Sequence, residues 1–197
     1  AVLAIHSDKE GNYWIGTRNG GLDKFNYDKK SFTNYAHNPA NSNSLINNSI
    51  LVIEEDRAGV LWLGTFNSGM NSFDPKTGTF KRYVNNASDP NSLSDNRVYD
   101  ILEDREGFIW IGTYGGGLNK LDKTTGRITA YKHDEKNKTS ISSNSVWTID
   151  EDDSHNLWLG TFGGGLSIFD RTKETFTNFK NDPNDPSSLG DDNIIRV

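Results

Sequence analysis

Glycine-rich stretches are the first segments of this chain whose residue types could do chemistry. GTYGGGL at 112–118 follows the apolar run 108–111, and a glycine-rich loop after a strand can hold a phosphate group through backbone amides. Similar stretches stand at 16–22, 64–70 and 160–166, always 48 residues apart. The stretch lacks the Lys and Ser or Thr of a P-loop and the glycine spacing of a dinucleotide fingerprint. A turn between two strands is therefore favoured over a phosphate site.

The acidic and histidine side chains do not indicate a metal or catalytic site either. Asp150, Asp152 and Ser154 are loosely similar to a calcium loop, but His155 replaces its required glycine and Thr161 its bidentate Glu. The four histidines lack metal-ligand spacing, and no Ser/His/Asp set can be argued from spacing. The paired acids recur with the repeat, as charges on solvated turns do. We expect no catalytic residue, metal site or cofactor in this segment.

The repeat predicts short strands separated by turns. In the repeat 98–145, turn residues such as DKTTG lie between β-prone apolar segments. No segment keeps a helical period of 3.6 for ten residues. The predicted strands of this repeat are 98–102, 108–112, 118–121 and 128–131.

Four such strands per unit of 48 residues match the blade of a β-propeller. The fold class expected is all-β, with four four-stranded blades and the start of a fifth. Residues 193–197 share phase with residues 1–5, so we expect a piece of a longer array, with the remaining propeller blades in the same chain. The expected blades are 1–47, 48–95, 96–143 and 144–191, and 192–197 begin the next one.

Composition narrows the possible partners. The net charge of -6 and the absence of a basic cluster argue against bound nucleic acid. No apolar run approaches the length needed to span a bilayer. Cysteine is absent, which excludes disulfides and thiolate metal sites.

The segment SLSDNRVYDILEDREGFIWIGTYGGGLNKLDKTTGRITAYKHD (92–134) resembles the regulator-propeller repeat of bacterial hybrid two-component sensors. The matching features are Ser-Leu and Asn before the first strand, the Glu-Asp-x-x-Gly turn, Trp-Ile-Gly-Thr and Gly-Gly-Leu. All four repeats carry them, with local departures at His155, where the others have Gly, and at Glu174, in place of the turn glycine at 78 and 126.

The resemblance implies part of a seven-bladed propeller in the periplasm. In that family a membrane helix, a histidine kinase, a receiver and often a DNA-binding domain follow the propellers. It further implies a homodimeric sensor that detects oligosaccharides and regulates transcription through a phosphorelay.

Ligand-binding candidates lie where two kinds of propeller loop share one rim. Aromatic and amide groups there suit a sugar, because an apolar ring face stacks while the hydroxyls bond. The alternative is that the aromatic side chains pack between blades and the Asn side chains cap turns. The candidates are Arg18, Phe66, Tyr114, Phe162, Asn48, Asn96, Asn144, Asp192 and, on a first strand, Trp147.

Three functions remain open at this point. A ligand-sensing segment of a membrane histidine kinase is favoured by the resemblance. A protein-interaction scaffold and a propeller lyase or glycosidase are the alternatives.

Overall fold

The computed structural model describes residues 1–197, which form β-strands and no helix. No helix long and apolar enough to cross a membrane is therefore present. The strands are β1 (Val2–Ser7), β2 (Tyr13–Thr17), β3 (Leu22–Asn26), β4 (Ser31–Tyr35), β5 (Ile50–Glu55), β6 (Leu61–Thr65), β7 (Met70–Asp74), β8 (Thr79–Tyr83), β9 (Val98–Glu103), β10 (Ile109–Thr113), β11 (Gly117–Leu121), β12 (Ile128–Tyr131), β13 (Val146–Glu151), β14 (Leu157–Thr161), β15 (Leu166–Asp170) and β16 (Thr175–Phe179).

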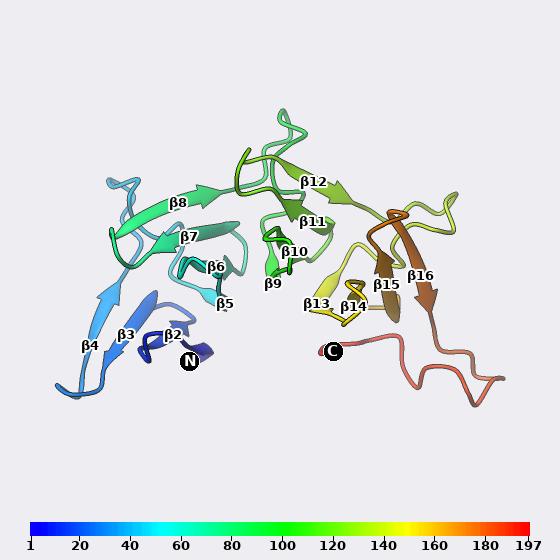
Figure 1. The fold of residues 1–197 in the computed structure, drawn as a ribbon, viewed down its shortest axis with the longest axis horizontal. Helices are drawn as coiled ribbons and strands as arrows, with labels where there is room; N and C mark the ends of the chain where they lie inside the picture. The colour runs from blue at the N-terminus through cyan, green and yellow to red at the C-terminus, as the bar shows by residue number, and fades with distance from the viewer.

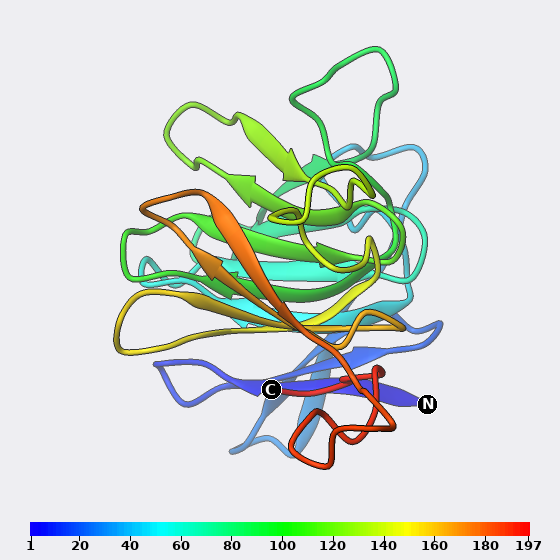
Figure 2. The same ribbon diagram turned by 90° about the vertical axis from the view of Figure 1, so that its right-hand side faces the viewer.

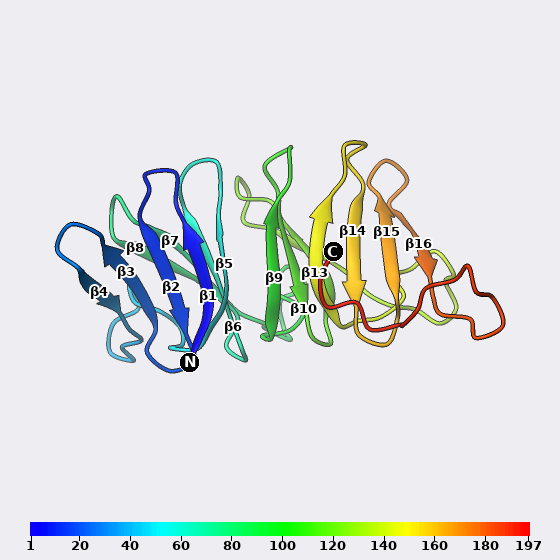
Figure 3. The ribbon, with the colours of Figure 1, turned by 90° about the horizontal axis from the view of Figure 1, so that it is seen from below.

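Each repeat forms one four-stranded antiparallel sheet, and the strands pair in chain order. The four sheets, called blades 1 to 4 in chain order, are arranged as an open arc with β1, β5, β9 and β13 on its inner side (Figure 1). Figure 3 shows these inner strands along the inside of the arc. The all-β blade architecture predicted from the 48-residue period is thus confirmed.

Strand bounds follow the prediction with small shifts at the turns. The second strand of blade 3 begins at Ile109 and not at Phe108, because Phe108 closes the preceding turn. Its N–H donates to Asp104 Oδ1 at 2.9 Å, and its carbonyl accepts from the Asp104 N–H at 3.0 Å. The fourth strand, Ile128–Tyr131, has the predicted bounds.

Consecutive blades are joined by tryptophan side chains. Trp14 packs into the face of blade 2, where its ring meets Phe73 edge-on at 5.7 Å. Trp62 and Trp110 fill the same place at the next two junctions. These three rings are buried, whereas Trp158 of blade 4 is 36% exposed. The hydrophobic core is therefore divided among the junctions between blades.

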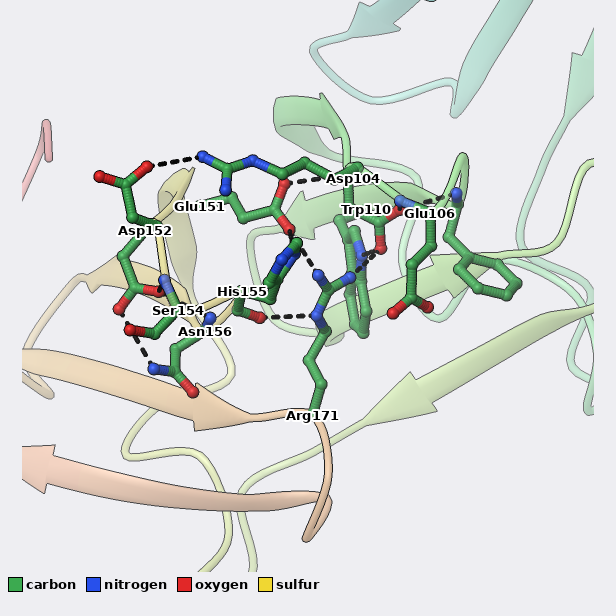
Figure 4. Close-up of polar contacts among 12 residues, drawn as sticks. Asp104, Glu106, Trp110, Glu151, Asp152, Ser154, His155, Asn156 and Arg171 are labelled. Carbon is green, nitrogen blue, oxygen red and sulfur yellow. Dashed lines mark hydrogen bonds and ion pairs between the residues drawn. The ribbon is translucent and has the colours of Figure 1, made fainter.

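Ion pairs cross two of the junctions on one rim. Arg171 of blade 4 pairs with Asp104 of blade 3 and with Glu151 of its own blade, and its Nε donates to a backbone carbonyl (Figure 4). Lys123 of blade 3 occupies the same repeat position, with its Nζ 3.0 Å from Asp56 of blade 2. Buried carboxylates need such partners, since burial penalises an unpaired charge.

The positions where the fourth repeat departs from glycine keep the glycine backbone conformation. His155 has a φ of 65°, against 91° for Gly107 in the same turn of blade 3. Glu174 has a φ of 52°, against 76° for Gly126. Lys30, the blade 1 counterpart of Glu174, has a φ of 50°. Three residues other than glycine therefore lie in the left-handed region, at a cost of about 1 kcal/mol or more each.

Residues 192–197 lie against blade 4 but form no strand. The N–H of Ile194 donates to the Thr161 carbonyl at 3.0 Å, and the N–H of Val197 to Thr148 Oγ1 at 3.4 Å. A strand requires a paired neighbour, and no further strand is present on that side. The role of this segment as the first strand of a fifth blade, and the expected blade boundaries, stay predictions.

Candidate functional site

Loops gather at one end of the strands and build the predicted rim. Seen from the side, short hairpin turns lie at one end and the longer connections at the other (Figure 2). The loop after the second strand is bonded to the connection that enters the next blade: Gly21 N–H donates to the Asn48 carbonyl at 2.9 Å, and Gly69 N–H to the Asn96 carbonyl at 2.7 Å. The two kinds of loop therefore lie together.

A β-bulge in each inner strand supplies further residues to this rim. The pairing of the first two strands of each blade skips one residue, between Val2 and Ala4 in blade 1 and at the same place in the others. Bulges leave a residue unpaired and redirect its side chain. The four skipped residues are Leu3, Leu51, Tyr99 and Trp147.

The amide and carboxylate candidates are engaged inside their own loops. In each, the side-chain Oδ1 accepts a hydrogen bond of 2.6–2.8 Å from a backbone N–H eleven residues earlier in the chain. These bonds close the long connection between blades, as side-chain caps do in turns. A ligand-binding role for them stays a prediction, next to this structural role. The residues concerned are Asn48, Asn96, Asn144 and Asp192.

The aromatic candidates of blades 3 and 4 form one stack. The Trp147 ring lies between Tyr99, at 5.4 Å and 18°, and Phe162, at 5.2 Å and 13°. Tyr114 flanks the stack, 5.8 Å from Tyr99 and 6.5 Å from Phe162. Sequence reasoning selected three of these rings but omitted Tyr99, although Tyr99 has the same repeat position as Trp147.

Arg97 extends the stack with a charged group. Its guanidinium lies 4.9 Å from the centre of the Tyr114 ring and pairs with Asp95 at 2.6 Å. Arg97 is not among the candidates predicted from the sequence, since the other repeats carry no arginine at its position.

Trp147 differs from every other tryptophan in its hydrogen bonding. The repeat tryptophans each donate their indole N–H to an Asp of the preceding turn, at 2.7–3.1 Å. The indole nitrogen of Trp147 is buried and has no partner. A buried donor without a partner costs free energy, so such groups often mark a functional site.

Blades 1 and 2 leave a cavity of about 470 Å³ at the same rim. Arg18 and Phe66 line it, and Phe66 is 51% exposed. The remaining side chains are apolar or amide and hydroxyl groups, and no acidic side chain lies among them. They are Ala1, Leu3, Leu51, Asn19, Asn47, Ser49 and Asn67.

Two carboxyl groups of the inner strands have raised pKa values. Burial, and then the nearby carboxylates of Asp100 and Glu103, raise the pKa of Glu54 to about 7. Burial raises the pKa of Asp100 to about 6, although the backbone N–H groups of Ile149 and Ile101 oppose the shift. No group of three His, Cys, Asp or Glu side chains is placed to hold a metal ion.

The chain matches the model of the two-component regulator propeller at residues 1–19, 44–67, 92–115 and 140–163. These matches begin near each first strand and end in the loop after the second strand, so every blade contributes one. No curated protein matches the chain closely enough to count as a relative.

Solved structures show the same fold. The extracellular domain of a protein described as a hybrid two-component system, BT3049 of B. thetaiotaomicron, is 29% identical with a TM-score of 0.76, and the match covers 91% of this chain and 24% of that one. The extracellular domain of BT4673 from the same organism is 24% identical with a TM-score of 0.74, over 94% of this chain and 23% of that one. Virginiamycin B lyase of Staphylococcus aureus is 17% identical with a TM-score of 0.67, over 93% and 57%.

The chain spans about a quarter of the length of the two extracellular domains. At 17% identity the lyase shows a shared fold alone. Each blade carries the matched repeat, and the sheets are arranged as in these extracellular domains. The chain is therefore built from two-component regulator propeller repeats, one in each blade.

Proposed function

We propose that this chain is a ligand-sensing segment of a hybrid two-component sensor histidine kinase and that its rim binds an oligosaccharide. The observation that carries the proposal is the concentration of aromatic rings and free polar groups at one rim. The stack of Tyr99, Trp147 and Phe162 and the cavity at Phe66 lie on the same end of the strands. Stacking faces beside hydroxyl and amide groups suit the two sides of a sugar ring.

The segment acts by binding and not by catalysis in this proposal. A ligand that binds one packing of the blades more tightly than another shifts the population toward it. In a homodimeric sensor such a shift would bias the kinase domains across the membrane. The similarity to extracellular domains of two-component systems supports a place outside the cytoplasmic membrane, and we propose the periplasm.

We further propose that other blades of the same repeat cover the two outer faces of the arc. Ile5 and Phe32 of blade 1 are 68% and 63% exposed, whereas their counterparts Ile53 and Phe80 lie at the junction with blade 1. Trp158 is likewise exposed where the other repeat tryptophans are buried. Uncovered apolar faces of this kind favour association with neighbouring repeats.

A glycan array on the full-length protein, followed by calorimetry, tests the proposal. We expect saturable binding of a defined oligosaccharide that the Phe66→Ala substitution weakens. Thr129→Ala is the control, because Thr129 is exposed on the outer strand β12 of an inner blade, away from the rim. Absence of any glycan binding, together with specific capture of a protein through the rim, would favour the scaffold alternative. Turnover of a glycan, abolished by one carboxylate substitution, would favour an enzyme.

A further inference from the structure

The cavity of blades 1 and 2 and the aromatic stack of blades 3 and 4 occupy equivalent places in the repeat. Two repeats, or 96 residues, separate equivalent positions in the two places. The residues equivalent to Leu3, Leu51 and Phe66 are Tyr99, Trp147 and Phe162. In blades 3 and 4 the Trp147 ring stacks on Phe162 with one face and on Tyr99 with the other, so the Phe162 ring is covered on that side. In blades 1 and 2 the smaller side chains of Leu3 and Leu51 leave the cavity open, and the Phe66 ring is exposed.

Arg18 is a cavity residue whose counterpart two repeats later has different chemistry. Its counterpart in blade 3 is the aromatic Tyr114. Within residues 1–197 the guanidinium of Arg18 makes no hydrogen bond or ion pair, and no acidic side chain of these residues lines its cavity. Arg82 and Arg171, by contrast, are bound to protein oxygens. In a chain of net charge -6, an arginine without a carboxylate partner in a cavity is positioned for an anion brought by a ligand.

We infer that this cavity binds a sugar unit that carries a carboxylate, a uronic acid, and that Arg18 determines this preference. The inference rests on the proposed oligosaccharide-binding function. A guanidinium can hold a carboxylate through two parallel N–H···O bonds. The exposed Phe66 ring offers an apolar face to the sugar ring. Asn19 and the Ser49 hydroxyl, which form no side-chain hydrogen bonds within the chain, are available for its hydroxyls.

The test measures binding of uronic-acid oligosaccharides and of their carboxyl-reduced counterparts to the full-length protein by array and calorimetry. We expect the acidic form to bind at least about 10-fold more tightly, as a charge-assisted hydrogen bond implies. Arg18→Gln should abolish this preference, and Arg127→Gln should retain it. Arg127 is the matched control, because its side chain also lacks a partner but it lies at the β11–β12 turn.

A substitution that fills the cavity gives a second readout. Leu51→Trp introduces the residue that blade 4 carries at this position, so the fold accommodates it, and we expect loss of binding of the acidic form. Preference for the reduced form, or an acidic preference retained by Arg18→Gln, would overturn the inference while the proposed oligosaccharide sensing stands. Absence of binding of every glycan on the array would overturn both.

Discussion

Arg171→Met tests whether buried charges hold neighbouring blades together. The Arg171 side chain is 11% exposed, and its guanidinium joins Asp104, whose side chain is fully buried, to Glu151, at 8%. Methionine keeps much of the side-chain volume but leaves both carboxylates without their cation. Removing one partner of a buried ion pair typically costs about 3–5 kcal/mol.

For Arg171→Met we expect a loss of unfolding free energy at the lower end of this range. Asp104 keeps the indole N–H of Trp110 at 2.7 Å and two backbone donors, and Glu151 keeps the N–H of Arg105 at 2.9 Å. These bonds continue to stabilise the charged forms. We therefore expect Arg171→Met to lower the free energy of unfolding by about 3 kcal/mol, which at a slope of about 2 kcal/mol per molar urea moves the midpoint by about 1.5 M.

Urea unfolding followed by tryptophan fluorescence measures this shift. Lys173→Met is the control, because Lys173 pairs with Asp170 at the surface and is 74% exposed; its midpoint should not change. Arg171→Lys should recover most of the loss, since blade 3 carries Lys123 at the same position. A midpoint for Arg171→Met within about 0.3 M of the unsubstituted protein would refute the idea that this ion pair joins the blades.

Three further predictions concern stability. Gly117→Ala should cost at least about 3 kcal/mol, because its φ is +78° and an added Cβ would lie 2.2 Å from a backbone oxygen. Gly126→Ala, with φ +76° and open space around it, should cost about 1 kcal/mol in the same urea experiment. Trp147→Phe should lower the free energy of unfolding by less than about 1 kcal/mol, and Trp110→Phe by about 2–4 kcal/mol. Of these two residues, Trp110 donates its N–H to a buried carboxylate and Trp147 does not. Equal losses would contradict this reasoning. Because folding raises the pKa of Glu54 from 4.5 to about 7, the folded state binds more protons and stability falls as pH rises across that window. Glu54→Gln should reduce this fall by about 1–2 kcal/mol after screening, as urea midpoints between pH 4.5 and 8 would measure.

The amino-acid sequence determined the blade and the turns that bound it. The spacing of Trp14, Trp62, Trp110 and Trp158 fixes a unit of 48 residues, and local turn chemistry places the strand ends within one or two residues. These features are periodic because each blade packs against the next one through the same side-chain positions. Repetition is therefore sufficient to predict them.

Tertiary structure decided how the candidate side chains are used. The oxygen of Asn48 accepts a hydrogen bond from a backbone N–H of its own loop, so the structure favours the turn-capping role that the sequence leaves as an alternative to ligand binding. Trp147 stacks between residues 48 positions before it and 15 after it, whereas Leu51 at the equivalent position helps leave a cavity open. Side chains from adjacent blades meet at the rim without following the period. Their contacts depend on ring size and orientation in three dimensions, and a one-dimensional spacing does not contain that information.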